Sequence, residues 1–448
     1  MLDRRNFVLL SAAASVAVPV PALAAAKPSR ASEVRALRLF AETTHPRGRE
    51  AAADKSWAGH WSALEAGAQR LSDGAYFIAL RRGLGWFEDG HTTVLPFEFT
   101  GGVPEALKAG PFGLALPLRA EVFADGAFVT AAGEAARTLL GQRLERVGAK
   151  STIDIMRAHA DKWPGNKAWA QRWAGAALTS PAQLHGLAAI ADPAGPIAIR
   201  TAGSSLDLTA SRVPSESLTS VERTATEREG WAKQAGGGNY VRPLPDRRSL
   251  YLSIDDMGDV AGMTFEQLTR DAFAAMADPA VDRIIVDLRR NGGGNNYLGE
   301  PLRKQMAASR FNRPGGLYVL ISPQTFSAAQ NLANRLERET FALFVGEPTG
   351  GAPNHYGDAS PFQGKASEIT AIVSTIPWFD SYPQDPRPWI MPDLPVPRTF
   401  ADWLAGRDRA LDVALAHRGE GTADFLSRER IFYFRRASQT AEWKPFWL

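Results

Sequence analysis

The chain has 448 residues, of which 45% are hydrophobic and 22% charged, an ordinary globular composition that is too long for a single core. Lysine and arginine number 51 against 48 acidic residues, giving a net charge of +3 without a basic block, so nucleic acid is not an expected partner. Cysteine is absent, which excludes a thiol nucleophile and a thiolate metal site. We therefore expect two or three domains without disulfide bonds.

The first 24 residues have the pattern of an export signal. Arg4 and Arg5 precede an apolar run that extends to Val20, and small residues up to Ala24 form a cleavage pattern. An uncleaved anchor is the weaker interpretation, because the run falls short of about 18 residues and is rich in alanine. We expect a twin-arginine signal peptide over 1–24, no stable membrane insertion after its cleavage, and a periplasmic or secreted protein.

A helical domain is predicted over 27–104, and it ends in a turn. Apolar residues recur at helical spacing in two segments, 31–40 and 57–80. The pair Asp89-Gly90 is a turn signal, and an extended segment follows it. His91 therefore lies on a turn, where side chains often serve function. The alternative is that His91 is an ordinary surface or core histidine.

A second domain, rich in β-strands, is predicted over 105–212. Asp125-Gly126 is expected to form a hairpin turn between two short strands. Further apolar runs predict strands at 114–118, 144–148, 196–200 and 206–209, with helices at 134–140 and 163–178. Glycine, proline, serine and charged residues then predict a linker over 213–247.

An α/β domain is predicted over 248–448. Strands and helices alternate in the order strand 249–254, helix 264–276, strand 284–288, helix 297–306, strand 317–321, helix 327–338 and strand 341–345. This alternation predicts a parallel sheet with right-handed crossovers.

Two turns of this domain have the features of an acyl-transfer site. Gly292, Gly293 and Gly294 follow one strand, where their backbone N–H groups can point at a ligand. Ser327 follows the next strand and begins a helix, whose positive end favours a developing negative charge. The alternative is structural: Ser327 caps its helix, and the glycines only make a tight turn. Because ligands bind at the carboxyl ends of parallel strands, two such turns together favour a site.

The chain resembles the tail-specific (C-terminal-processing) serine peptidase family, which includes the tricorn core protease. The resemblance rests on three motifs in the family's order, at 287–294, 325–330 and 345–351. It implies a crotonase-like (ClpP-like) catalytic domain, a PDZ-like domain over 105–212 and the activity of a serine endopeptidase. It also implies Ser327 as the nucleophile and extended peptide or unfolded protein as the substrate.

The base in this resemblance is a histidine. The lysine-dependent branch of the family carries its lysine 25 residues after the serine, where this chain has Ala352, and the next lysine is Lys365. The tricorn-like and retinoid-binding branch carries a similar Asp-Gly-His-Thr motif, in which the histidine is the general base. That motif implies His91 as the base, and His355, close to the missing lysine, is the alternative.

The remaining site residues are less sharply specified. The branch carries an acid shortly before a Pro-Asp pair, which implies Asp385 as the third catalytic residue, with Glu347 as the alternative. Either carboxylate could equally be a solvated loop residue. We expect the N–H groups of Gly293 and Ala328 to form the oxyanion hole. No His-Glu-x-x-His spacing and no phosphate-loop lysine occurs, so neither a metal nor a cofactor is expected.

Three functions remain open from the sequence. The first is an exported serine endopeptidase of Ser-His-(Asp/Glu) type. The second is a non-catalytic protein on the same fold that binds a peptide or an apolar ligand, for which an aromatic group could line a groove: Trp378, Phe379, Tyr382 and Trp389. The third is a small-substrate esterase or amidase, because Ser-His chemistry does not itself select a peptide. The oligomeric state is not specified by the sequence.

Overall fold

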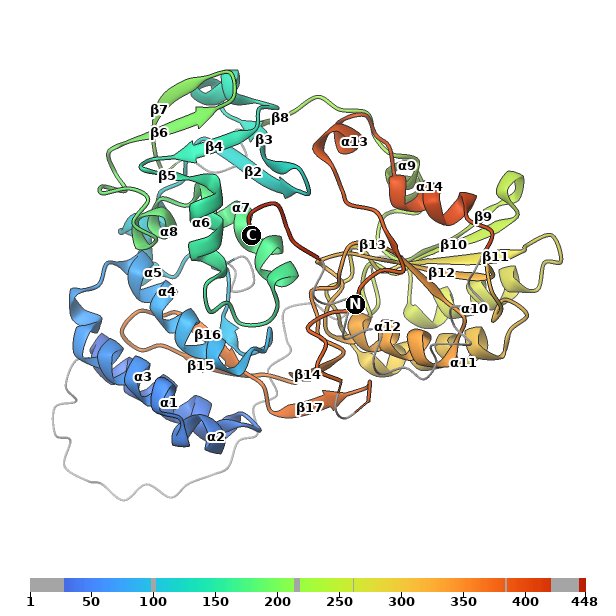
Figure 1. Ribbon diagram of the computed structural model, residues 1–448, viewed down its shortest axis with the longest axis horizontal. Helices are drawn as coiled ribbons and strands as arrows, with labels where there is room; N and C mark the ends of the chain where they lie inside the picture. Colours follow the sequence, from blue (N-terminus) through green and yellow to red (C-terminus); the bar gives the residue numbers. More distant parts are fainter. Residues whose placement is uncertain (1–27, 98–101, 213–217, 261, 383–384, 420–442) are drawn as a thin grey trace.

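The computed structural model of the chain describes residues 28–97, 102–212, 218–260, 262–382, 385–419 and 443–448 (Figure 1). The expected signal peptide over 1–24 lies outside these residues. Among the helices of the described ranges, none is long and apolar enough to cross a membrane.

The N-terminal unit is helical, as predicted. It consists of α1 (Arg30–Thr44), α2 (Gly48–Ala53), α3 (Lys55–Gly67) and α4 (Asp73–Leu84). Ser29 forms a capping box that starts α1, and Ser72 caps α4, which divides the single helix expected over 57–80. Trp57, Trp61 and Tyr76 are buried at its centre. The turn predicted at His91 is present, and β1 (Thr93–Val94) follows it.

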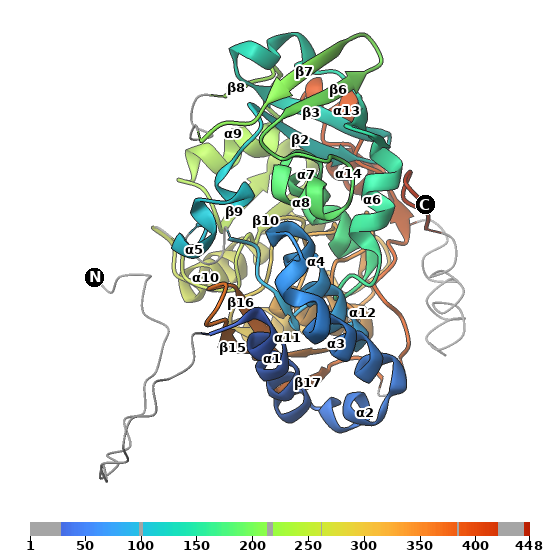
Figure 2. The same cartoon turned by 90° about the vertical axis from the view of Figure 1, so that its left-hand side faces the viewer.

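The second unit combines two small sheets with helices. Asp125-Gly126 forms the predicted hairpin turn between β2 (Leu118–Phe123) and β3 (Gly126–Ala132). The four-stranded sheet has the order β5-β4-β6-β7, formed by Lys150–Ser151, Leu144–Val147, Pro196–Thr201 and Ser205–Thr209. The helices are α5 (Glu105–Lys108), α6 (Thr152–Ala160), α7 (Lys167–Thr179) and α8 (Pro181–Gly186). Figure 2 shows α4 of the first unit beside α8, where Gly74 and Gly186 allow close backbone contact.

The third unit contains the predicted parallel sheet. Its strand order is β18-β13-β12-β11-β10-β9, and all neighbours are parallel except β9 and β10. The parallel strands are β10 (Ser249–Ser253), β11 (Arg283–Asp287), β12 (Leu317–Ile321), β13 (Leu343–Gly346) and β18 (Leu394–Pro395). One apolar cluster joins the sheet to α10 (Phe265–Met276), α11 (Glu300–Ala308) and α12 (Ala328–Glu339). A second joins its other face to α14 (Arg409–Ala416) (Figure 1).

The structure differs from the linker expected over 213–247. This stretch contains β8 (Thr219–Ser220), α9 (Glu227–Gln234) and β9 (Tyr240–Leu244), and β9 pairs with β10 as the antiparallel edge of the large sheet. Pro243 has no N–H group, and an edge strand tolerates it. The three glycines at 236–238, all with positive φ, turn the chain from α9 into β9. A proline and glycine composition typical of linkers here encodes an edge strand.

An arm of the third unit reaches back to the N-terminal helices. It contains β14 (Asn354–Gly357), β15 (Ser360–Gln363), β16 (Thr370–Val373) and β17 (Ile376–Phe379). β1 pairs with β16, and Glu33 of α1 accepts hydrogen bonds from the N–H groups of Ala366 and Ser367. Figures 1 and 2 show β15 and β16 beside α1, and Figure 1 shows them away from the large sheet. This pairing fixes the turn that carries His91 relative to the third unit.

Candidate active site

Ser327 has a strained backbone at the start of α12. Its φ of 55° and ψ of −126° are rare for a residue with a side chain, and its hydroxyl makes no capping hydrogen bond to the helix. The structural alternative, in which Ser327 serves as a helix cap, therefore does not describe this turn. The side chain is partly exposed, and the N–H of Ala328, the first of α12, follows it directly, whereas the N–H groups of Ala329 and Gln330 donate to the carbonyl of Phe326. Strain of this kind clusters at functional positions.

The glycine turn touches Ser327 directly. A Cβ atom on Gly293 would lie 2.5 Å from the Cβ and 3.0 Å from the Oγ of Ser327, and 3.3 Å from the backbone nitrogen of Ala328. The φ of 121° at Gly293 also favours glycine. The N–H of Gly293, however, donates to Oδ1 of the buried Asn291 at 2.8 Å. The predicted donors Gly293 and Ala328 thus lie at the serine, but the Gly293 N–H already has an acceptor.

His91 reaches the same place from the N-terminal unit. Its ring stacks on Phe326, the residue before Ser327, with 4.4 Å between ring centroids and 27° between planes. Phe326 also stacks on Trp169 of α7, with centroids 4.1 Å apart. A Cβ on Gly90 would lie 2.7 Å from the Phe326 ring, so glycine is needed for this approach. Phe326 therefore links all three units at the candidate site.

The carboxylate beside His91 is Asp89, which the sequence analysis named only as part of a turn. Its Oδ1 lies 3.7 Å from Nδ1 of His91, and its side chain is 1% exposed. The backbone N–H of His91 donates to Asp89 at 3.0 Å, the hydroxyl of Thr92 at 2.7 Å and that of Ser374 at 2.6 Å. Burial opposes its charge, but the nearby rings of His45 and His91 and the hydrogen bond from Ser374 outweigh burial and hold the pKa of Asp89 below its usual range. Its position two residues before His91 was the available sequence signal.

Asp385 has other partners. Its carboxylate accepts hydrogen bonds from Ser381 and from Nε and Nη2 of Arg387, and Arg387 is also paired with Glu337. Burial alone would raise the pKa of Asp385, but the hydrogen bonds from Arg387 lower it. The structure thus places Asp385 in a buried arginine cluster, whereas the carboxylate that faces His91 is Asp89.

The two alternative residues, Glu347 and His355, lie in different places. Glu347 follows β13, where burial raises its pKa to about 7 against the attraction of Arg398. His355 lies in β14, and its ring stacks on His91 with centroids 5.5 Å apart. Burial first, and then repulsion from His91, lower the pKa of His355 to about 4, so it is neutral at neutral pH. Nδ1 of His355 lies 3.0 Å from the carbonyl of Ala352.

The four aromatic residues expected as a groove are dispersed. Trp389 is buried, whereas Phe379 on β17 is 46% exposed. Trp378 donates its indole N–H to Asp358 and lies beside Tyr297 with ring centroids 6.4 Å apart. Tyr382 lies beneath the guanidinium of Arg338. A single apolar groove lined by all four is therefore not formed.

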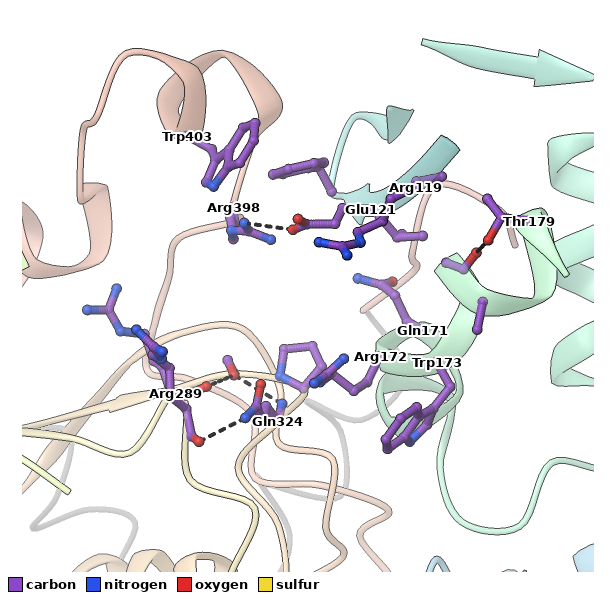
Figure 3. Close-up of a pocket in the computed structure, with 18 of the residues that line it drawn as sticks. Arg119, Glu121, Gln171, Arg172, Trp173, Thr179, Arg289, Gln324, Arg398 and Trp403 are labelled. Atoms are coloured by element: carbon purple, nitrogen blue, oxygen red, sulfur yellow. Dashed lines mark hydrogen bonds and ion pairs between the residues drawn. The ribbon is translucent and has the colours of Figure 1, made fainter. Parts of the chain in front are cut away.

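A large cavity lies between the second and third units (Figure 3). Its volume is about 1520 Å³, and the strand β2 lines it on one side. The opposite side is formed by the carboxyl ends of the parallel strands, including Arg289, Gln324 and Glu347. Arg398 forms an ion pair with Glu121 in the lining of the cavity. Ser327 and His91 lie outside this lining, although Gln324 belongs to the same loop as Ser327.

Within the described ranges, no three His, Asp or Glu side chains are arranged to hold a metal ion.

Comparison with known proteins identifies similarity in fold. No family model and no curated protein matches the chain. The structure is similar to that of mature CPAF, with a TM-score of 0.57 and 13% identity over 86% of this chain and 96% of that one. CPAF in complex with lactacystin gives a TM-score of 0.55 and 12% identity over 90% and 97% of the two chains. Superposition on the tricorn protease gives 12% identity over 88% of this chain and 37% of that one, with a TM-score of only 0.39. The chain therefore has a mixed α/β fold similar to that of CPAF.

Proposed function

We propose that the protein is a serine endopeptidase in which Ser327 is the nucleophile and His91 the general base. The proposal rests on the strained Ser327, whose side chain does not cap its helix, which packs against Gly293, and whose preceding residue, Phe326, stacks on His91. A serine hydroxyl needs an adjacent base to attack a carbonyl carbon. The sequence resemblance to the tail-specific serine peptidases and the similarity in fold to CPAF agree with this chemistry.

Asp89 supports the base in this proposal, in the role that the sequence resemblance gave to Asp385. Because Oδ1 of Asp89 faces Nδ1 of His91, the proton of a neutral imidazole is favoured on Nδ1. Nε2 is then free to take the proton of Ser327 as its Oγ attacks the peptide carbonyl. His91 returns this proton to the leaving amine, and the acyl-enzyme is hydrolysed by water in the reverse sequence of proton transfers.

The oxyanion hole is proposed to use the N–H groups of Ala328 and Gly293. The N–H of Ala328 is the first of α12 and has no partner within the helix. The N–H of Gly293 must be released from, or shared with, Oδ1 of Asn291 when the oxyanion forms. Hydrogen bonds in ligand-free sites commonly tighten or rearrange on substrate binding.

The substrate is proposed to be an extended or unfolded polypeptide. The cavity between β2 and the ends of the parallel strands has a volume of about 1520 Å³, and its lining includes Gln324, in the same loop as the proposed nucleophile (Figure 3). In this proposal residues 105–212 form a PDZ-like domain and residues 248–448 a crotonase-like catalytic domain. From the twin-arginine pattern over 1–24 we further propose that the protein is exported to the periplasm or out of the cell.

The test is reaction with a fluorophosphonate probe together with hydrolysis of an unfolded protein. We expect the parent to be labelled and active, Ser327→Ala to be neither, and Ser309→Ala, whose hydroxyl donates to Met306, to match the parent. Lactacystin, which is bound in one CPAF structure, serves as a competitor of labelling. Labelling of Ser327→Ala as strong as that of the parent contradicts the assignment of the nucleophile.

A second candidate is a non-catalytic protein that binds peptides or apolar ligands, and a third is a small-substrate esterase or amidase. The hydrogen bond from the Gly293 N–H to Asn291 favours the non-catalytic candidate, because it occupies one oxyanion donor. An unlabelled Ser327 in a folded protein supports binding without catalysis. A labelled protein that cleaves nitrophenyl esters but not peptides supports the esterase.

A further inference from the structure

A second imidazole faces the carboxylate of Asp89. Nε2 of His45 lies 3.7 Å from Oδ2 of Asp89, and the side chain of His45 is fully buried. His91 faces the other oxygen, Oδ1, at the same distance. Nε2 of His45 and Nδ1 of His91 have no hydrogen-bond partner within 3.5 Å among the described residues. Both buried nitrogens therefore have Asp89 as their charged neighbour.

The proton of His45 is directed at Asp89 by the chain around it. The backbone N–H of Arg47 donates to Nδ1 of His45 at 3.0 Å, so Nδ1 is the acceptor and the neutral ring carries its proton on Nε2. The ring cannot turn away, because it stacks on Phe87 at 4.0 Å and packs against Tyr356 at 4.6 Å between centroids. His45 itself ends α1 as its C-cap.

The contacts on Asp89 divide between its oxygens. Oδ1 accepts the backbone N–H of His91 and faces its ring, whereas Oδ2 accepts the hydroxyls of Thr92 and Ser374 and faces His45. A carboxylate held on both oxygens has a fixed orientation toward His91. The titratable groups packed around this carboxylate come from separate elements and are His45, His91, His355 and Tyr356.

We propose that His45 is a positioning residue of the Asp89–His91 pair, in which its Nε2–H donates to Oδ2 of Asp89 and keeps that carboxylate ionised and aimed at His91. The inference rests on the proposed function, because it concerns the same base. A contraction of a few tenths of an ångström on substrate binding brings both N–H groups within hydrogen-bonding distance, as is common for catalytic contacts that are long in ligand-free proteins.

The kinetic test compares His45→Phe, which removes the donor, with His45→Gln, whose amide nitrogen can replace Nε2. We expect His45→Phe to lower kcat roughly tenfold with KM unchanged, since a hydrogen bond to a charged group is lost. The acid limb of the kcat/KM profile moves to higher pH, because the whole attraction of Asp89 then falls on His91. We expect His45→Gln to keep most of the parent's kcat and most of its pH profile. His60→Phe, on α3 of the same unit, is the matched control and leaves kcat and the profile unchanged.

A structural readout separates this inference from the proposed function. In protein labelled with ¹⁵N-histidine, we expect His45 to show a protonated Nε2 whose resonance moves in Asp89→Asn but not in Ser327→Ala. The proposal is overturned if the ¹⁵N resonance of His45 does not move in Asp89→Asn. It is also overturned if His45→Phe and His45→Gln lose the same amount of kcat and both keep the pH profile of the parent. If the protein shows the expected ¹⁵N shifts but has no peptidase activity, the contact between His45 and Asp89 is supported and the proposed endopeptidase function is refuted.

Discussion

Two buried aspartates of this protein have opposite kinds of partner. Asp287, at the end of β11, is fully buried and accepts hydrogen bonds from Arg228, Arg289 and Tyr251. Asp89 is also buried, but it faces His45 and His91 and accepts hydrogen bonds from hydroxyl groups. In each case burial opposes the charge, whereas the partners outweigh it and lower the pKa of the carboxyl group.

The difference lies in what the partners can do. Arginine stays protonated at every pH of interest, so the Asp287 cluster has a fixed charge and holds α9 and the C-terminal segment at Asp408 against the sheet. Histidine can exchange a proton near neutral pH, so the Asp89 cluster can take part in proton transfer. Since both pKa values are lowered, each cluster stabilises the fold at neutral pH, and this stability is lost as the pH falls below about 4. The same buried carboxylate thus serves structure or chemistry according to its partners.

The largest expected effect is the loss of activity in Asp89→Asn. An amide cannot stabilise the imidazolium that forms when His91 takes the serine proton, and kcat should fall roughly 10³- to 10⁴-fold. The melting temperature should change much less, because the hydroxyl contacts can persist. Hydrolysis of an unfolded protein and thermal denaturation measure the two effects.

Asp385→Asn is the matched comparison, because the sequence resemblance assigned the acid to that residue. We expect this variant to lose stability through Arg387 while each folded molecule keeps most of its activity. If Asp385→Asn is inactive and Asp89→Asn active, the roles given to the two carboxylates must be exchanged.

Arg228→Met should give the second-largest effect, on stability rather than activity. Arg228→Met takes a buried cationic partner from both Asp255 and Asp287, and the free energy of unfolding should fall by about 3 kcal/mol. Urea denaturation measures this loss. Arg248→Met breaks an exposed pair with Asp282 and should change little. Equal losses in the two variants would refute the structural importance of the Asp287 cluster.

Glu347→Gln should give the smallest effect. It extends the comparison to a partly buried acid for which no side-chain hydrogen bond from arginine or histidine is seen among the described residues. Because its pKa is raised to about 7, the folded state binds the proton more tightly than the unfolded chain does. Stability should therefore decline as the pH rises from about 4.5 to about 7. In the parent, we expect the free energy of unfolding to be about 2 kcal/mol lower at about pH 8 than at about pH 5 because of this group, and Glu347→Gln should lack this difference. Denaturation at the two pH values measures it. Glu266→Gln, at an exposed carboxylate, should behave as the parent.

The parallel sheet could be predicted from the sequence because its signals are local. The apolar run 317–321 forms β12 within the predicted limits, and the helix after Ser327 begins one residue later than expected. The linker expected over 213–247 instead includes an edge strand in the structure. Glycines and prolines such as Gly236 to Gly238 and Pro243 are found both in linkers and beside or within edge strands, so composition does not separate the two. Only pairing with β10 distinguishes the two cases.

By itself, the sequence determined that a serine follows a buried strand at a helix start, that a glycine turn follows the neighbouring strand, and that a histidine follows an Asp-Gly turn. The tertiary structure decided which groups meet. The pairing of β1 with β16 and the stack of His91 on Phe326 bring distant segments together. The same packing brings His45 and Ser374 to Asp89, and brings Glu337 to Arg387, the partner of Asp385. Partner choice depends on contacts between residues far apart in the chain, which local patterns do not encode.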